Sequence, residues 1–291
     1  MFIDLQLHST YSDGYLTPTE LAGFCVKNNI KIASLTDHNT VSGFGEFKNA
    51  CARKGIKPIC GMELYCKLAH RRFNILWYNF EYKNPELHKM LRDSQIRRRR
   101  CMRSFLQKLS KRGLKINIDR VLDKYTHYIP INHVIDDIMA ESSNVKKIKK
   151  HFGKKIIREE NIIKEYFYNK EIGILRDNLI DFKKIVRLRK EIGGQLVLCH
   201  PAKHRTIDIV FWEKLKKLGL DGIEVLSPHH SVGSVMAIQN FAKTSGLVET
   251  GGSDFHRVER SEFSLQNSWQ YFKIDAKNLR GVEKVVGKIN K

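Results

Sequence analysis

The chain has 291 residues, 42% of them hydrophobic, so it is long enough for one large domain or two modest ones. Its formal net charge of +21 attracts polyanions such as nucleic acids, nucleotides and phosphate esters, although lysines on solvated faces would give the same total. No apolar run reaches about 18 residues, no two cysteines form a CxxC pair, and the segment MFIDLQLH has no signal-peptide pattern. We therefore expect neither a membrane span nor a disulfide framework, but a cytoplasmic protein with free thiols.

The first ninety residues alternate strand and helix signals. The segment Thr17-Pro18-Thr19-Glu20 predicts a helix start, with Thr17 as N-cap, proline at the first helical position and Glu20 completing a capping box. Short apolar runs predict four strands, at residues 2–8, 31–36, 57–65 and 72–80. This alternation indicates an α/β fold with a parallel sheet or barrel.

The middle of the chain, residues 92–190, has a different character. Most of the net positive charge falls there, strand signals are weak, and helical spacing of apolar residues dominates. One long basic helix is expected up to about Leu114, and further lysine-rich helix over 144–171. We predict a basic helical insertion or cap that divides a barrel into residues 1–91 and 191–291.

Strand and helix signals return after the insertion. Strands are expected at 195–200, 222–226 and 247–250, and helices at 211–218 and 232–245. The last strand leads into Gly251-Gly252-Ser253-Asp254.

Histidine and acidic residues gather at the ends of the predicted strands. A strand-end histidine is, taken alone, more often a structural hydrogen-bonding group than a ligand, and Asp13-Gly14 alone could be a turn. In a parallel barrel, however, these ends converge on one face. The residues at or just past a strand end are His8, His38, Glu63, His200 and Asp254, and the residues on the loops that follow are Asp13 and His256.

Such a cluster of imidazoles and carboxylates predicts a metal centre. Divalent cations neutralise the carboxylates, and a mixed set of nitrogen and oxygen ligands without thiolate suits Zn, Mn or Fe. Glu63 could bridge two ions. Paired ions lower the pKa of a bound water and stabilise the oxygens of an in-line phosphoryl displacement.

Six segments resemble the successive motifs of the PHP (polymerase and histidinol phosphatase) family, in the same order. They are similar above all to the branch of nucleoside-bisphosphate and oligoribonucleotide phosphatases, and they cover roughly residues 1–80 and 190–260. The segments are IDLQLHSTYSDG, SLTDHNTVSG, ICGMELY, LCHPA, GIEVLSPHH and TGGSDFH.

The resemblance implies a distorted (β/α)7 TIM-like barrel with a helical insertion after the fourth strand. It implies one to three divalent ions per chain (Mn, Zn, Fe or Mg), with catalytic roles for His38, Glu63 and Asp254. The ligand positions that match the family are His8, Asp13, His38, Glu63, His200, Asp254 and His256.

Two ligand positions depart from the family pattern. Gln6 stands where the first histidine of a His-x-His motif is usual, and Asn74 stands where the strand after Glu63 usually carries a histidine. In the family these two imidazoles serve the paired ions that share the glutamate, whereas the set expected for a third ion, Asp13, His38 and His256, is intact. Amide oxygens are weak ligands for zinc-like ions, so the site either holds fewer or different ions or has lost activity.

The insertion carries candidate phosphate contacts. His133 matches a Gly-Arg-Pro-His motif of the branch, but Ile131 replaces its arginine. Arg97 and Arg100 share a helix face where the branch keeps arginines, so both could bind one phosphate, although a solvated basic face explains them equally well.

Three functional hypotheses follow from these residues. The first is a metal-dependent phosphoesterase that hydrolyses a phosphate monoester of a nucleotide or short oligonucleotide through metal-bound hydroxide. The second is a degenerate barrel that binds a nucleotide or nucleic acid with little or no catalysis. The third is nuclease action on longer RNA, which steep salt dependence of binding would reveal. The partner in each case is a phosphorylated small molecule, nucleotide, or short RNA or DNA, and no membrane is involved.

Overall fold

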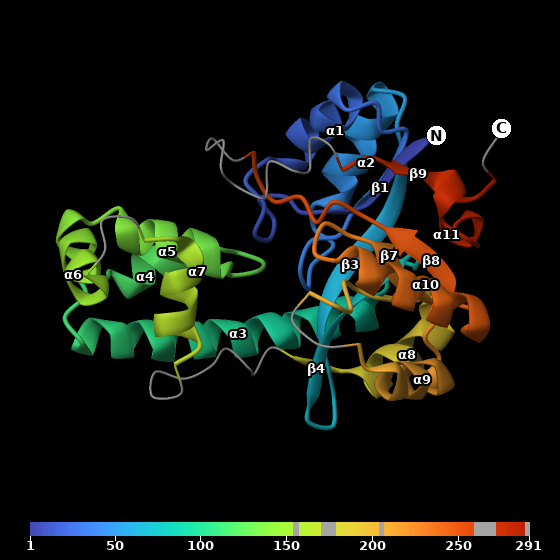
Figure 1. The fold of residues 1–291 in the computed structure, drawn as a ribbon. Helices are drawn as coiled ribbons and strands as arrows, with labels where there is room; N and C mark the ends of the chain where they lie inside the picture. Colours follow the sequence, from blue (N-terminus) through green and yellow to red (C-terminus); the bar gives the residue numbers. More distant parts are fainter. Residues whose placement is uncertain (154–156, 170–178, 204–206, 259–271, 289–291) are drawn as a thin grey trace. The chain divides into compact units, whose positions relative to one another are not determined.

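The protein is described here by a computed structural model, and its residues fall into two compact units. The first unit comprises Met1–His88 and Leu179–Lys291, and the second comprises Lys89–Asn178 (Figure 1). The structure describes residues 1–153, 157–169, 179–203, 207–258 and 272–288.

The first unit begins with the alternation expected from the sequence. Its elements are β1 (Phe2–Leu7), α1 (Pro18–Lys27), β2 (Ile32–Leu35), α2 (Phe44–Arg53) and β3 (Lys57–Leu68). β1 pairs with β2, and β2 with β3, in parallel register.

The predicted start of α1 is confirmed. The Glu20 backbone N–H donates to Thr17 Oγ1 at 3.2 Å, and the Thr17 N–H donates to Glu20 Oε2 at 2.8 Å. This capping box satisfies two backbone donors that a helix start leaves open.

The parallel pairing expected from the sequence is interrupted at β4 (Arg71–Tyr78). β3 extends to Leu68, and only two residues separate it from β4, with Ala69 in the left-handed region at φ 51°. So short a link allows a hairpin but no crossover, so β4 runs antiparallel to β3. The hairpin places Asn74 opposite Tyr65, near the end of β3.

The second stretch of the first unit again alternates strands and helices. Its elements are β5 (Ile180–Asp181), α8 (Phe182–Ile192), β6 (Gln195–Leu198), α9 (Ile209–Leu218), β7 (Gly222–Leu226), α10 (Val232–Ser245), β8 (Val248–Gly251), β9 (Ile274–Asp275), the short 3₁₀ helix Ala276–Asn278 and α11 (Glu283–Val286).

The strands form one nearly closed, barrel-like sheet in the order β8-β7-β6-β4-β3-β2-β1-β9, with β5 paired to β3. β4 is antiparallel to β6 as well as to β3, so β3 and β6 run in the same direction. A parallel bridge between Leu7 and Phe255 joins the segment after β8 to β1. The carboxyl ends of β1, β2, β6 and β8 therefore meet at one rim, as in a distorted TIM-like barrel.

Apolar faces of the helices cover this sheet. Leu21, Cys25, Phe47 and Cys51 are fully buried on α1 and α2, in a cluster that also contains Phe255. Their spacing of three or four residues is the helical period, so each helix turns one stripe toward the sheet.

The second unit is helical. It contains most of α3 (Pro85–Lys111), followed by α4 (Ile118–Asp123), α5 (Ile131–Met139), α6 (Ser142–Phe152), α7 (Glu159–Ile162) and the π-helical turn Ile163–Phe167.

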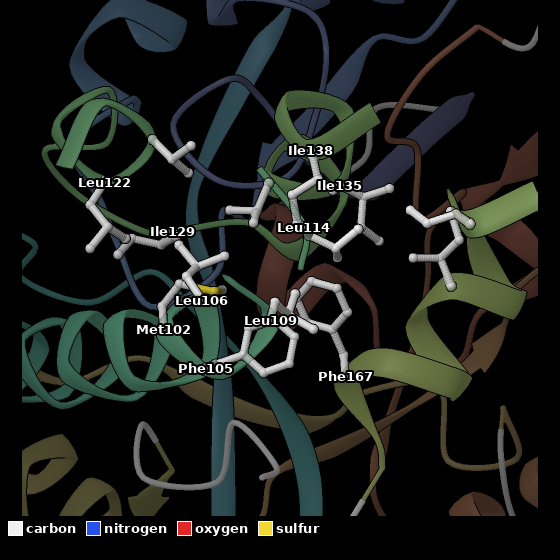
Figure 2. Close-up of a cluster of buried hydrophobic side chains, with 14 residues drawn as sticks. Met102, Phe105, Leu106, Leu109, Leu114, Leu122, Ile129, Ile135, Ile138 and Phe167 are labelled. Atoms are coloured by element: carbon white, nitrogen blue, oxygen red, sulfur yellow. The ribbon is translucent and has the colours of Figure 1, made fainter. Parts of the chain in front are cut away.

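This unit has a hydrophobic core of its own. Figure 2 shows Phe105 and Leu109 of α3 together with Ile135 of α5 and Phe167, and the ring centroids of Phe105 and Phe167 lie 4.2 Å apart. The further helix expected over 144–171 is present as α6, which ends at Gly153 in the left-handed conformation, α7 and the π-helical turn, whereas residues 154–156 and 170–171 lie outside the described residues.

The far boundary of this unit also differs from the expected residue 190. β5 and α8 belong to the first unit, where β5 pairs with β3.

Within the described residues, no helix has the length and hydropathy needed to cross a bilayer.

A substitution at Gly252 tests the close contact between β1 and the segment that follows β8. A Cβ at this position would lie 2.4 Å from the Cβ of Gln6 and 2.6 Å from its backbone nitrogen. We expect Gly252→Ala to lower the free energy of unfolding by about 1–3 kcal/mol, because the two segments must separate. Chemical denaturation measures the change.

The matched control is Gly23→Ala in the middle of α1, where an added Cβ meets no atom within 4 Å. This variant should gain roughly 0.4–1 kcal/mol, since alanine restricts the unfolded chain. Equal effects of the two substitutions would contradict the packing described for Gly252.

Candidate metal centre

Most of the predicted ligands lie where the sequence placed them, at strand ends of the first unit. His8 directly follows β1, and Asp254 lies three residues beyond β8. His38 follows β2, and His200 follows β6. The expectation that Glu63 ends a strand was wrong, because Glu63 lies inside β3, which continues to Leu68.

Main-chain pairing brings the loop residues to the same rim. A parallel bridge joins His38 to Glu63. The Tyr15 N–H donates to the His256 carbonyl at 2.8 Å, and the His8 N–H donates to the Phe255 carbonyl at 3.0 Å. These bonds fix the loop that carries Asp13 against the segment that carries His256.

One group of side chains converges on Asp13. His8 Nδ1 lies 3.4 Å from Asp13 Oδ1, His38 Nε2 lies 3.2 Å from Oδ2, and His256 Nε2 lies 3.3 Å from Oδ1. The rings of His8 and His256 stack with centroids 4.3 Å apart. Ligand atoms of all four residues lie within 4.8 Å of one another, close enough to share one cation.

A second group surrounds Glu63 and Asp254. His8 Nε2 lies 3.2 Å from Glu63 Oε2 and 3.2 Å from Asp254 Oδ1, and His200 Nε2 lies 3.3 Å from Glu63 Oε1. The structure thus brings all seven predicted ligands together, with His8 shared by both groups.

The two substituted positions also lie in this second group. Gln6 Nε2 is 2.9 Å from Glu63 Oε2, 2.9 Å from Asp254 Oδ1 and 3.1 Å from Cys199 Sγ. Asn74 Nδ2 donates to Glu63 Oε1 at 2.5 Å. Both amides therefore present N–H groups to the carboxylates.

Two cationic or potentially cationic residues were missed as site residues. Lys203 Nζ lies 2.7 Å from Asp254 Oδ2, and His229 Nε2 lies 2.7 Å from the same oxygen. Both side chains reach solvent, at 24% and 31% exposure. The position of Lys203 three residues beyond His200 was the available signal, since the turn after β6 returns it to the rim.

Opposite charges set the protonation of the carboxylates. Burial raises the pKa of Asp13, but His38 and His256 outweigh it and hold the pKa well below its usual value. Burial likewise opposes ionisation of Glu63, yet the neighbouring His38 and a hydrogen bond from His200 hold the pKa of Glu63 well below its usual value. Both groups are therefore ionised at neutral pH.

Asp254 is ionised for a similar reason, because Lys203 and His256 lower its pKa well below the usual value against the effect of burial. His200 behaves in the opposite way. Burial, assisted by the positive charge of Lys203, lowers the pKa of His200 to about 4, so its imidazole is neutral at physiological pH.

Buried partners orient the ligand loops. Asp37, next to His38, accepts hydrogen bonds from the Ser9 N–H at 2.8 Å, Ser9 Oγ at 2.7 Å and Ser12 Oγ at 2.6 Å. These bonds fasten the turn that carries Asp13 to the segment that carries His38. Such outer partners position ligands in metal sites.

Strained backbone concentrates at the same rim. The φ angles of His200, Asp254 and Asn39 are 23°, 51° and 49°. Non-glycine residues occupy this region at a cost of about 1–3 kcal/mol each, and such strain is typical of functional sites. The Glu224 carboxyl group compensates at His200, whose N–H it accepts at 2.7 Å.

The donor set around Asp13 fits a divalent cation. His8 Nδ1 is buried and makes no hydrogen bond to any part of the chain that the structure describes. A lone pair on Nδ1, facing a carboxylate 3.4 Å away, would be satisfied by a cation between them.

The predicted phosphate contacts lie in the second unit. Arg100 is exposed, and Arg97 and His133 are partly buried. The neighbouring Arg98 has a structural role, because its Nε donates to the Ile129 carbonyl at 2.6 Å and its guanidinium lies 4.3 Å from the Tyr128 ring.

Comparisons with known proteins show a matching family model, related sequences and a similar solved structure. A family model described as the PHP domain matches residues 4–176. A 3',5'-nucleoside bisphosphate phosphatase from Chromobacterium violaceum is 27% identical over 265 residues, covering 87% of both chains. A 5'-3' exoribonuclease from Haemophilus influenzae is 23% identical over 262 residues, covering 87% of this chain and 89% of that protein. A solved structure from Bifidobacterium adolescentis has a TM-score of 0.73 at 19% identity, covering 94% of this chain and 97% of that chain, which shows a shared fold.

Asp4, which supports the segment before Asp254, should make stability depend on pH. Burial raises its pKa from 3.8 to about 6, although Ser253 donates to it through Oγ at 2.5 Å and through its N–H at 3.0 Å. The folded state therefore holds a proton that the unfolded chain releases at lower pH. This contribution is complete below pH 4 and is lost as the pH rises through 6, a change of roughly 3 kcal/mol.

The measurement compares the free energies of unfolding of the wild type and Asp4→Asn from pH 4 to pH 7, in chelator. The wild type should have its highest free energy of unfolding relative to Asp4→Asn at low pH. This relative stability should fall as the pH rises through 6. A difference that stays constant across this range would contradict the raised pKa.

Proposed function

The chain belongs to the PHP domain family, and on this premise we propose that it is a metal-dependent phosphoesterase that hydrolyses a phosphate monoester of a nucleotide or short oligonucleotide. The observation that carries the proposal is the convergence of imidazoles and ionised carboxylates from separate strand ends on one rim. Catalytic groups of barrel enzymes gather at this kind of rim.

The substrate class is supported by the relatives and by charge. The two relatives described above are a nucleoside bisphosphate phosphatase and an exoribonuclease, both of which act on phosphate esters of nucleotides. The net charge of +21 favours multiply charged anions. Arg97, Arg100 and His133 are the proposed phosphate contacts in the second unit.

A divalent cation held in this cluster would supply Lewis-acid polarisation of a phosphate oxygen and lower the pKa of a water. The chain's own groups prepare the site for such an ion. Asp13, Glu63 and Asp254 remain ionised, and neutral His200 keeps a lone pair available at one ring nitrogen. We propose that His38 has a direct catalytic role as a metal ligand, and that Glu63 and Asp254, also predicted as catalytic, act by positioning His8, His200 and Lys203.

Lys203 and His229 would orient the substrate. Both contact Asp254 Oδ2 and both reach solvent, so their N–H groups can also meet an incoming phosphate oxygen. A charge-assisted hydrogen bond of this kind is about twice as strong as a neutral one.

The alternative function is a barrel that binds a nucleotide or nucleic acid without hydrolysis. Gln6 and Asn74 favour it, because their amides occupy carboxylate oxygens that would otherwise face cations. Ile131, in place of an arginine, weakens one expected phosphate contact.

Hydrolysis is tested by assaying purified protein with Mn²⁺ against a panel of nucleotides, nucleoside bisphosphates, short oligoribonucleotides and phosphosugars. We expect turnover with at least one nucleotide. His38→Ala should lower kcat/KM roughly 100-fold or more, because loss of even an outer partner of a metal ligand costs 10–100-fold. The control is His70→Ala, an exposed histidine in the β3–β4 turn, which should leave activity unchanged.

Absence of turnover with every divalent metal, together with no effect of His38→Ala on nucleotide binding, would refute the enzyme hypothesis.

The alternative is tested by Gln6→His combined with Asn74→His. If the natural chain is an enzyme, both proteins hydrolyse the same nucleotide, and the double variant differs only in rate and metal preference. Activity found only in the double variant would show that the natural chain binds without catalysis. A circular dichroism spectrum and an unfolding curve verify that the double variant folds.

A further inference from the structure

We propose that the cluster holds a single divalent ion, bound by His8, Asp13, His38 and His256, and that Glu63 and Asp254 are not ligands. The carboxylate oxygens of both residues are instead bound by the protein donors Gln6, Asn74 and Lys203. The inference rests on the proposed function only in requiring a metal-binding cluster, and it concerns where the ion lies and how many ions bind.

The tautomer of His256 points to an ion beside Asp13. His256 Nδ1 lies 2.7 Å from the Asp254 carbonyl oxygen. A carbonyl can only accept, so Nδ1 carries a proton, and Nε2 is the ring nitrogen that can give a lone pair to a cation. That lone pair faces Asp13 Oδ1 at 3.3 Å. Two electron-rich atoms at this distance repel unless a proton or a cation lies between them.

His8 provides a second nitrogen in the same way. Its Nε2 lies between two carboxylate oxygens, at 3.2 Å from Glu63 and 3.2 Å from Asp254, which favours a proton on Nε2. Nδ1 then presents its lone pair toward Asp13. An imidazole that directs one nitrogen to a metal and the other N–H to a carboxylate is a common arrangement, and the carboxylate then acts as an outer partner.

His38 completes the set with Nε2 at 3.2 Å from Asp13 Oδ2. Three imidazoles and one carboxylate, with ligand atoms inside 4.8 Å, match the four-coordinate nitrogen and oxygen sets that divalent ions accept.

An ion between Glu63 and Asp254 would meet an amide. Gln6 Nε2 lies 2.9 Å from Glu63 Oε2 and 2.9 Å from Asp254 Oδ1, the same two oxygens that His8 Nε2 faces. Gln6 is fully buried, and the close approach of Gly252 to its Cβ holds it in place. Two N–H hydrogens directed at this corner supply the positive charge that a cation would bring.

The remaining oxygens are occupied in the same manner. Asn74 Nδ2 donates to Glu63 Oε1 at 2.5 Å, where His200 is the other neighbour. The Lys203 ammonium lies 2.7 Å from Asp254 Oδ2 and provides a full positive charge. Charge-assisted bonds of this kind replace metal coordination around both carboxylates.

Counting bound Mn²⁺ in two isosteric variants separates the two groups of side chains. After removal of metals, reloading with Mn²⁺ and desalting, elemental analysis should find one ion per wild-type chain, with the electron paramagnetic resonance spectrum of an isolated Mn²⁺. Asp13→Asn should abolish tight binding. Glu63→Gln should still bind one ion, with affinity lowered by at most roughly 10–100-fold, as expected for an outer partner.

Two or more ions in the wild type, an exchange-coupled Mn²⁺ spectrum, or loss of the ion in Glu63→Gln would overturn the proposal. Unfolding curves in chelator establish that both variants fold, and each variant changes one carboxylate to the matching amide. Gln6→His combined with Asn74→His should gain at least one further ion, and no gain would also count against the proposal.

Metal counting does not depend on turnover, so the two proposals can fail separately. A wild type that binds one ion and hydrolyses nothing supports this inference and contradicts the proposed enzyme. A wild type that hydrolyses nucleotides with two ions supports the enzyme and contradicts this inference.

Discussion

Mutual repulsion of three carboxylates, Asp13, Glu63 and Asp254, governs the rim of the barrel. Glu63 is completely buried and the side chain of Asp254 is only 3% exposed. Burial costs several kcal/mol for each ion, and like charges about 4 Å apart repel by about 4 kcal/mol at an effective dielectric constant of 20. Compensating positive charge is therefore a condition for this arrangement, and the chain provides it through imidazoles, amides and an ammonium group, with a divalent ion completing the set in our proposal.

The fold can hold these carboxylates close together because each one comes from a separate segment of the chain. Each carboxylate stands on its own segment, and the reversal of β4 leaves the neighbouring strands pointing the same way. Backbone bonds from the Ser9 turn to Asp37 and from His200 to Glu224 keep strained residues in place. Hydrophobic packing of the helices against the sheet stabilises the domain and so holds the rim together.

Much of the candidate site could be predicted from sequence because its residues lie at strand ends, and strand ends follow from apolar runs and caps. The box at Thr17 and Glu20 is a local signal of this kind. The position of Glu63 inside β3 was missed, since a two-residue hairpin lengthens both strands through pairing that local patterns do not reveal. Lys203 and His229 were missed because they reach Asp254 only through loop conformation. The hydrogen bonds of Gln6 likewise depend on contacts between residues far apart in sequence.

The dependence of folding stability on free Mn²⁺ tests most directly whether a divalent ion completes the charge balance at this rim. An ion that binds only the folded chain raises the free energy of unfolding by RT ln(1 + [Mn²⁺]/Kd), about 2.7 kcal/mol at a concentration 100 times Kd. We expect such a rise for the wild type, with the slope of one ion at high concentration. A free energy of unfolding that stays the same from chelator to saturating Mn²⁺ would contradict it.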